Sequence, residues 1–185
     1  MLRRQAGGGL LEVLVAITVS SMGLLALAGS HLHALRQSTA LEHRMLAAWL
    51  VSDLGERMRA SGADGTSANA YEFSGLDFSD QAAAPPAPSI LCAQPTHTCT
   101  LAEMAAADLH VWRVRVRAQL PEGSGFVLPD ANAGGAVDIW VAWVEPLAAN
   151  PDEVQRAGGD RECPAGLAAD NHSAVVRCHS LRVQL

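Results

Sequence analysis

The amino-acid sequence predicts an α+β protein, in which a long N-terminal membrane-spanning helix is followed by a small head with an antiparallel β-sheet. Residues 10–60 contain no proline and keep apolar side chains on a helical period. Further along, segments 112–120, 137–144 and 175–185 have the composition and alternation of strands. We therefore expect three or four antiparallel strands after one long helix.

Length and charge limit the classes of function. The chain has 185 residues, which suffice for one membrane segment and one modest domain with a single core. Its 13 basic residues, all arginine, are outnumbered by 19 acidic residues, and the formal net charge is −6. Phosphate contacts need a clustered positive face, so we expect no binding of nucleic acid.

The first part of the predicted helix is apolar throughout. From Val13 to Leu35 there is no Asp, Glu, Lys or Arg. At a rise of about 1.5 Å per residue, this stretch could cross a hydrocarbon core of about 30 Å. Arg3 and Arg4 precede it, and positive residues beside a membrane helix stay in the cytoplasm. The C-terminal part is therefore expected on the periplasmic side of the inner membrane.

One carboxylate, Glu12, lies at the border of this apolar run. An ionisable group at such a place is a candidate for function because moving it into lipid is costly. The small residues Ala6, Gly7, Gly8 and Gly9 come before the apolar run, whereas a secretory signal has its cleavage site after it. A cut at these residues would leave the helix in the product.

The segment from Gly7 to Ala16, with Glu12 in its middle, resembles the class III signal of type IV pilins and pseudopilins. The resemblance implies cleavage between Gly7 and Gly8 by a prepilin peptidase, N-methylation of Gly8, and a role for Glu12 in assembly. It divides the chain into a leader (1–7), a helix (8–60) and a head (61–185). Gly8 and Gly9 depart from the phenylalanine and Thr or Ser that the family favours there. The alternative is an uncleaved signal anchor with an incidental glutamate.

The second half of the helix is amphipathic, which predicts that it lies against a domain. Its stripe consists of Leu32, Leu35, Thr39, Leu46, Leu50, Leu54 and Met58. Residues 61–69, rich in Gly, Ser and Asp, are expected to end the helix.

The segment 47–62 is similar to the corresponding segment of the PilV group of minor pilins. Seven positions carry this similarity: Asp53, Leu54, Glu56, Arg57, Met58, Arg59 and Ala60. It implies that the segment helps to seat the head. The alternative is a solvated helix end with a favourable pair between Asp53 and Arg57 at spacing i, i+4.

The middle of the chain is expected to be mostly loop. Residues 71–89 are predicted to form an extended surface linker with an Ala-Pro run, and residues 101–110 a short helix or turn. In 112–120, apolar residues alternate with Arg113, Arg115 and Arg117, which predicts a strand with one solvated face. A basic surface for an acidic partner or DNA is the alternative. Residues 121–135 are expected to be a turn-rich connection.

The C-terminal region is predicted to contain two strands. Segment 137–144 has the composition of a strand whose latter half is buried on both faces. Residues 148–173 read as a loop, and 175–185 as the final strand. The apolar parity of that strand shifts near Cys178, which predicts a bulge or break. By the resemblance, the region between Cys163 and Cys178 corresponds to the variable C-terminal loop of pilins.

The four cysteines are Cys92, Cys99, Cys163 and Cys178. An even number in an oxidising compartment predicts two disulfides, for which three pairings exist. We expect the local pairs, Cys92–Cys99 and Cys163–Cys178, because each closes a short loop. A zinc site is the alternative, but there is no CxxC and no histidine pair at ligand spacing.

No enzyme motif is present, so we expect neither catalysis nor a cofactor. The glycines at 7–9 precede a membrane run and not a phosphate loop, and the seven histidines are scattered. The resemblance implies a structural minor pilin whose partners are the prepilin peptidase, other minor and major pilins and inner-membrane lipid. The alternatives are a minor pseudopilin of a type II secretion system and a membrane-anchored binding protein or tip-exposed adhesin.

Overall fold

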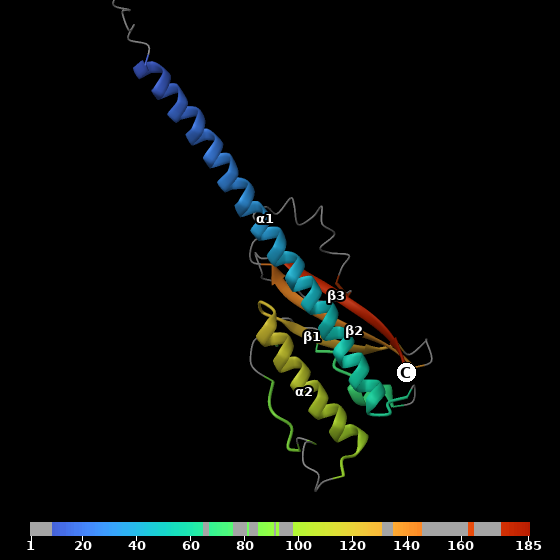
Figure 1. Cartoon of the computed structure of the whole chain (residues 1–185). Coiled ribbons are helices and arrows are strands. Elements are labelled where there is room, and N and C mark those ends of the chain that lie inside the picture. The colour runs from blue at the N-terminus through green and yellow to red at the C-terminus, as the bar shows by residue number, and fades with distance from the viewer. Residues whose placement is uncertain are drawn as a thin grey trace, which may run out of the picture. The chain divides into compact units, whose positions relative to one another are not determined.

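The computed structural model describes residues 9–64, 67–75, 81, 85–90, 92, 98–130, 135–145, 163–164 and 175–185. In chain order its elements are α1 (Gly9–Ala60), η1 (Ala68–Tyr71), α2 (Leu101–Gln119), β1 (Ser124–Pro129), β2 (Ala136–Glu145) and β3 (Val175–Gln184) (Figure 1). The chain divides into two compact units, Met1–Leu41 and Glu42–Leu185. We call the first the N-terminal unit and the second the head. The expected α+β class is confirmed.

The long helix is confirmed, and its end is well defined. The amide of Gly62 donates to the carbonyl of Arg59 at 3.1 Å, and the amide of Ala63 donates to that of Met58 at 3.1 Å. Gly62 has a φ of +74°. This is the hydrogen-bond pattern of a Schellman motif, in which a glycine adopts the left-handed conformation that other residues avoid. The glycine-rich segment after residue 60 therefore ends the helix as predicted.

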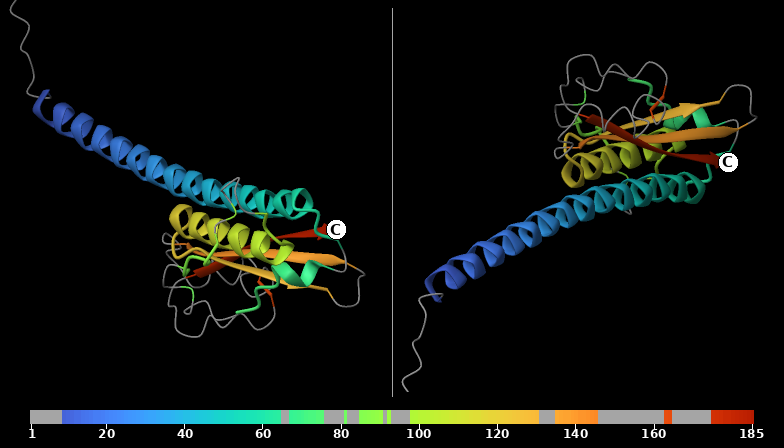
Figure 2. Two further views of the ribbon diagram at one scale, coloured as in Figure 1. Left: turned by 90° about the horizontal axis from the view of Figure 1, so that it is seen from below. Right: turned by 90° about the horizontal axis from the view of Figure 1, so that it is seen from above.

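The head is built on an antiparallel sheet in the order β1-β2-β3. The head part of α1 and α2 cover the same face of this sheet (Figure 2). Odd-numbered residues of β2, such as Val137, Ile139 and Val141, belong to the main core beneath the helices. Even-numbered residues, such as Ala142 and Val144, belong to a smaller cluster. Because side chains alternate along a strand, these two clusters occupy opposite faces.

The head part of α1 supplies much of the main core. Five of its apolar side chains are fully buried there: Ala47, Leu50, Val51, Leu54 and Met58. The indole Nε1 of Trp112 donates to the carbonyl of Leu50 at 2.8 Å, which joins α2 to α1. A Cβ on Gly55 would lie 3.0 Å from Cγ2 of Val183, so α1 passes close to β3. The predicted amphipathic face is thus confirmed over this part of the helix.

The strand predicted at 112–120 is wrong, because residues 112–119 form the second half of α2 and Leu120 is its C-cap. Thr100 caps the helix in a capping box with Glu103. The buried residues of α2 are Ala105, Trp112 and Val116, and Leu120 follows them, so the spacings are seven, four and four. That stripe has the helical period, and it outweighs the local alternation of valine and arginine.

The turn-rich connection predicted at 121–135 is also wrong in part, because it contains β1. Two residues of segment 71–89, which was predicted to be a surface linker, form hydrogen bonds with the outer edge of β1. Phe73 and Val127 exchange two backbone hydrogen bonds, of 2.9 and 3.0 Å. The side chain of Gln81 accepts from the amide of Gly125 at 2.9 Å and donates to its carbonyl at 3.0 Å.

The C-terminal strand is confirmed, but the break near Cys178 is wrong. The register with β2 runs without interruption from the pair of Val175 with Glu145 to that of Gln184 with Ala136. The apolar residues of β3 change from even to odd positions after Cys178 because both faces of the sheet are covered by apolar clusters. Leu181 and Val183 lie in the main core, whereas Val176 and Cys178 join the smaller cluster. As predicted, the latter half of β2 is buried on both faces, from Val141 to Glu145.

Candidate functional site

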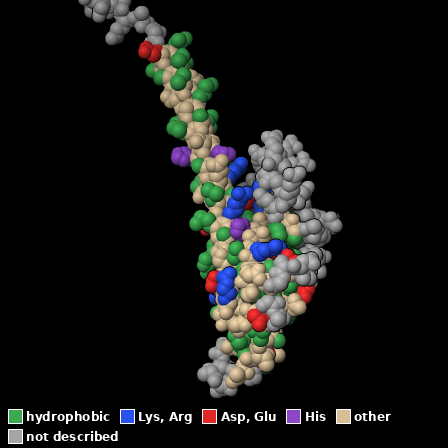
Figure 3. Space-filling view, turned by 90° about the vertical axis from the view of Figure 1, so that its right-hand side faces the viewer, with side chains coloured by type: hydrophobic (Ala, Val, Ile, Leu, Met, Phe, Trp, Pro, Cys, Tyr) green, Lys and Arg blue, Asp and Glu red, His purple; other side chains and the backbone are tan. Residues whose placement is uncertain are grey.

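The N-terminal unit presents an apolar surface along the helix. Side chains from Leu10 to Leu35 are exposed, and many are more than half exposed, for example Leu14 at 63% and Leu24 at 68%. Hydrophobic side chains follow the visible face of this part of α1 in Figure 3. By length and composition, α1 could cross a membrane. A helix that is apolar on all sides needs lipid or protein around it, since water solvates such a surface poorly.

Two hydroxyl side chains within this stretch bond to their own helix. Thr18 Oγ1 donates to the carbonyl of Val15 at 2.9 Å, and Ser21 Oγ donates to that of Ile17 at 2.7 Å. The hydroxyls of Thr18 and Ser21 therefore have partners without water. Such internal bonds are what a helix in hydrocarbon requires, because an unsatisfied polar group there costs several kcal/mol.

Glu12 lies in the first turn of α1 and is exposed. The N-terminal end of a helix carries a partial positive charge, which favours a carboxylate at this position. The next basic residue after it in the chain is Arg36, about 36 Å away along the helix. Gly7 and Gly8, the expected cleavage and N-methylation sites, lie outside the described residues.

In the head, an ion network joins α1 to α2. Asp53 Oδ2 accepts from Arg57 Nε at 2.9 Å, as the i, i+4 spacing predicted, and from Arg115 Nη1 at 3.3 Å. Arg57 Nη1 also donates to Asp108 Oδ1 at 3.3 Å. The hydrogen bond to Asp53 raises the pKa of Arg57, so its guanidinium stays charged. The similarity of segment 47–62 implied a role in seating the head, and this network supplies physical contacts of that kind.

The three arginines of α2 do not form a solvated row. The Arg113 guanidinium stacks on the ring of Phe73 at 4.0 Å from its centroid. Arg115 contacts Asp53, and Arg117 donates to the carbonyl of Gln81. Burial lowers the pKa of Arg113. A common basic surface for DNA or an acidic partner is therefore not present in the arrangement of these three side chains.

Both expected disulfides are formed, Cys92–Cys99 and Cys163–Cys178. The second ties Cys163 to β3 and contributes to the smaller apolar cluster. Within the described part of the chain, no group of three or more His, Cys, Asp or Glu side chains could hold a metal ion.

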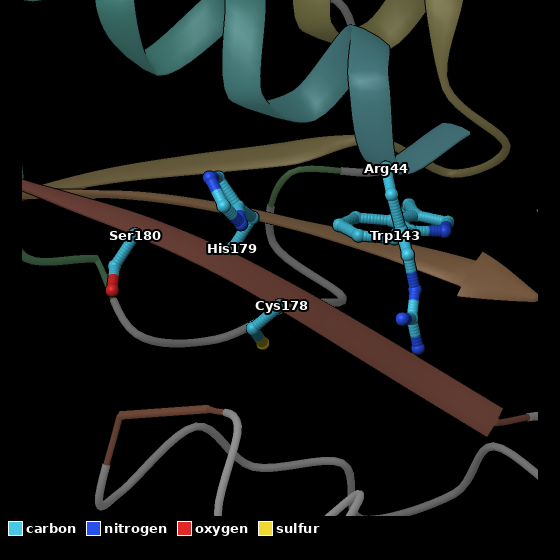
Figure 4. A pocket seen from close by; sticks show the side chains of 5 residues that line it. All are labelled: Arg44, Trp143, Cys178, His179 and Ser180. Atoms are coloured by element: carbon cyan, nitrogen blue, oxygen red, sulfur yellow. The ribbon is translucent and has the colours of Figure 1, made fainter. Parts of the chain in front are cut away.

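A pocket of about 420 Å³ lies in the head, lined by Arg44, Trp143, Cys178, His179 and Ser180. Figure 4 shows the His179 ring rising from β3 toward α1, whereas Cys178 and Ser180 point away from the helix. The Arg44 side chain comes from α1 and passes over Trp143 of β2. Sequence reasoning missed this site because its residues come from three distant segments and share no motif.

Beside this pocket, an imidazole faces a carboxylate. His43 Nδ1 lies 3.7 Å from Glu145 Oε1, and both atoms are buried without a hydrogen-bond partner among the residues that the structure covers. The contact joins α1 to the end of β2. His43 thus turns toward Glu145, and its neighbour Arg44 is the residue that reaches the pocket.

Comparison with known proteins adds no identification: no protein-family model, curated protein or solved structure matches the chain.

Proposed function

We propose that the protein is a minor pilin of the PilV type, made as an inner-membrane precursor and assembled into a type IV pilus after its leader is removed. The observation that carries the proposal is the apolar helix from Val13 to Leu35 with the single carboxylate of Glu12 at its border. Three further features support it: the glycines before the helix, the Asp53–Ala60 segment, and an α+β head closed by two disulfides.

The proposed mechanism depends on charge neutralisation. Removal of residues 1–7 creates a new amine at Gly8, four residues before Glu12. When helices leave lipid and pack in a filament, a positive charge beside a buried carboxylate lowers the cost of burying it. The amine of Gly8, on the same or a neighbouring subunit, provides that charge at the required depth. Cleavage therefore prepares the subunit for assembly.

A substitution at Glu12 tests this mechanism. We expect the Glu12→Gln precursor to be cleaved normally. Its amount in sheared filaments should fall at least about tenfold, which corresponds to a loss of about 1.4 kcal/mol of subunit interaction. Glu42→Gln is the matched control, because Glu42 is another exposed glutamate of α1. Its content in filaments should equal that of the wild type. A normal amount of Glu12→Gln in filaments would refute the mechanism.

The proposal as a whole is tested by N-terminal sequencing of the protein from membranes. Cells with an active prepilin peptidase should give a chain that begins at Gly8, whereas a chain that begins at Met1 would rule out the pilin. Deletion of the gene distinguishes the pilus from the type II secretion system. We expect loss of piliation or twitching with normal secretion of exoproteins.

A further inference from the structure

We propose that the pocket of Arg44, Trp143 and His179 binds a carboxylate side chain presented by an acidic segment of another protein. Its volume of about 420 Å³ is within the range of about 300–1,000 Å³ that is usual for ligand sites. All of its residues belong to the head. The proposal therefore does not depend on the function proposed for the N-terminal unit.

Arg44 supplies the positive charge of the site. Its side chain is exposed, and it forms no ion pair or hydrogen bond with any residue in the described ranges. The other arginines of the head part of α1 are occupied, Arg57 by Asp53 and Asp108, and Arg59 by Glu56. A guanidinium presents several N–H donors in a planar fork that fits a carboxylate with two hydrogen bonds.

The walls of the pocket suit an acidic side chain on a peptide. Trp143 is 1% exposed and belongs to the main core, so it is a fixed part of the wall of the pocket. Among the residues that the structure describes, no acidic side chain lines the pocket. The carboxylate of Glu145, at the end of β2, faces His43. These five lining residues therefore attract a bound carboxylate through Arg44 and add no negative side chain that would repel it.

The electrostatics favour a singly charged ligand. Burial lowers the pKa of His179, and the positive charge of Arg44 lowers it further. At neutral pH the imidazole is therefore neutral and can offer one N–H to a ligand oxygen. One permanent cation beside a neutral ring matches a carboxylate better than a dianionic phosphate, which usually binds several cationic groups or a helix N-terminus.

The test uses the isotope-labelled full chain in detergent micelles and two capped five-residue peptides. One peptide has a central glutamate between leucines, and the other has glutamine in its place. We expect the glutamate peptide to shift the Trp143 indole and His179 amide resonances with a Kd on the order of 1 mM. The glutamine peptide should bind at least about tenfold more weakly, because it lacks the charge.

Variants separate the site from general effects of charge. Arg44→Gln should lower the affinity for the glutamate peptide at least about tenfold. Arg44→Lys should have an affinity between those of Arg44→Gln and the wild type, because lysine keeps the charge but lacks the planar fork of donors. Arg59→Gln is the control, since Arg59 is an exposed arginine of the same helix that does not line the pocket. Its affinity should stay within about twofold of the wild type. The spectrum of each variant also reports whether it is folded.

Several outcomes would overturn the proposal. They are equal binding of the glutamate and glutamine peptides, and unchanged affinity of a folded Arg44→Gln variant. Acetate that binds as tightly as the peptide would point to a site for small acids instead of a protein segment. Inorganic phosphate that displaces the peptide more effectively than acetate would assign the pocket to phosphate groups.

Discussion

Tyr71 is the clearest case of a single residue whose chemistry is set by its surroundings. It is the only tyrosine of the chain and is fully buried. Its hydroxyl lies 3.0 Å from Asp108 Oδ2 and 2.8 Å from Ser61 Oγ. Burial raises the pKa of Tyr71 to about 12, and the charge and hydrogen bond of Asp108 add to the increase. The hydrogen bond between Tyr71 and Ser61 and the charge of Arg57 lower the pKa and partly oppose this increase.

Titration of the phenolate absorbance should therefore give a midpoint near pH 12 in the folded protein. An unfolded tyrosine ionises near pH 10, so the folded state holds this proton more tightly. Its contribution to stability is complete below about pH 10 and is lost as the pH rises toward 12. Asp108→Asn should lower the midpoint, and Tyr71→Phe should abolish the signal. A midpoint near 10 while the protein is still folded would contradict the burial of the ring.

At this scale the sequence predicts local partners and misses distant ones. The pair of Asp53 and Arg57 follows from their spacing along one helix and is present at 2.9 Å. Asp108 and Arg115, which complete the same network, lie on α2. Their contacts depend on how α2 packs against α1, and no local pattern contains that information.

Among the elements, α2 depends on its first turn. The amide of Glu103 donates to Thr100 Oγ1 at 3.4 Å, and the amide of Thr100 donates to Glu103 Oε2 at 2.8 Å. Thr100→Ala removes the side-chain acceptor and should lower the free energy of unfolding by about 1 kcal/mol. Thr100→Ser should restore most of it. Thr98→Ala is the control, because Thr98 is exposed and lies outside the cap. Denaturant unfolding of the full chain in detergent measures all three, and equal stability of Thr100→Ala and the wild type would refute the role of the cap.

The same helix shows why one element was mispredicted and others were not. The period of α1 extends over many turns, and the composition of 137–144 favours a strand, so both elements were predicted correctly. In α2 the alternation of Trp112 to Arg117 suggests a strand, although Thr100 and Glu103 already have the spacing of a capping box. Burial of Trp112 and Val116 decides the outcome, because both lie on the face of α2 that meets the main core.

Close packing around Trp112 also explains why β1 was missed. A Cβ on Gly125 would lie 2.4 Å from the Trp112 ring, so the strand needs glycine where it passes under α2. Glycine in a segment suggests a turn when only the sequence is known. Here it marks a close approach between a strand and an aromatic side chain.

At the scale of the whole molecule, the two disulfides should contribute unequally to the stability of the head. Cys163–Cys178 spans 15 positions and Cys92–Cys99 spans seven. The loop-entropy relation gives about 3 kcal/mol for the longer loop and about 2.4 kcal/mol for the shorter. Replacing Cys163 and Cys178 with serine should therefore destabilise the protein more than replacing Cys92 and Cys99. Unfolding of both double variants in denaturant measures the difference, and the reverse order would contradict it.

The N-terminal unit gives the last prediction, because its apolar surface should hold the whole chain in a membrane. Leu24 lies in the middle of the uncharged stretch and is 68% exposed. An arginine at the centre of a spanning helix costs about 2.5–3.5 kcal/mol. Leu24→Arg should therefore lower the share of protein that resists extraction from membranes with alkaline carbonate. Leu41→Arg is the matched control, since Leu41 is also an exposed leucine of α1 but lies beyond the stretch. If Leu24→Arg and Leu41→Arg both stay in the membrane fraction to the same extent as the wild type, this helix does not anchor the protein by crossing the bilayer.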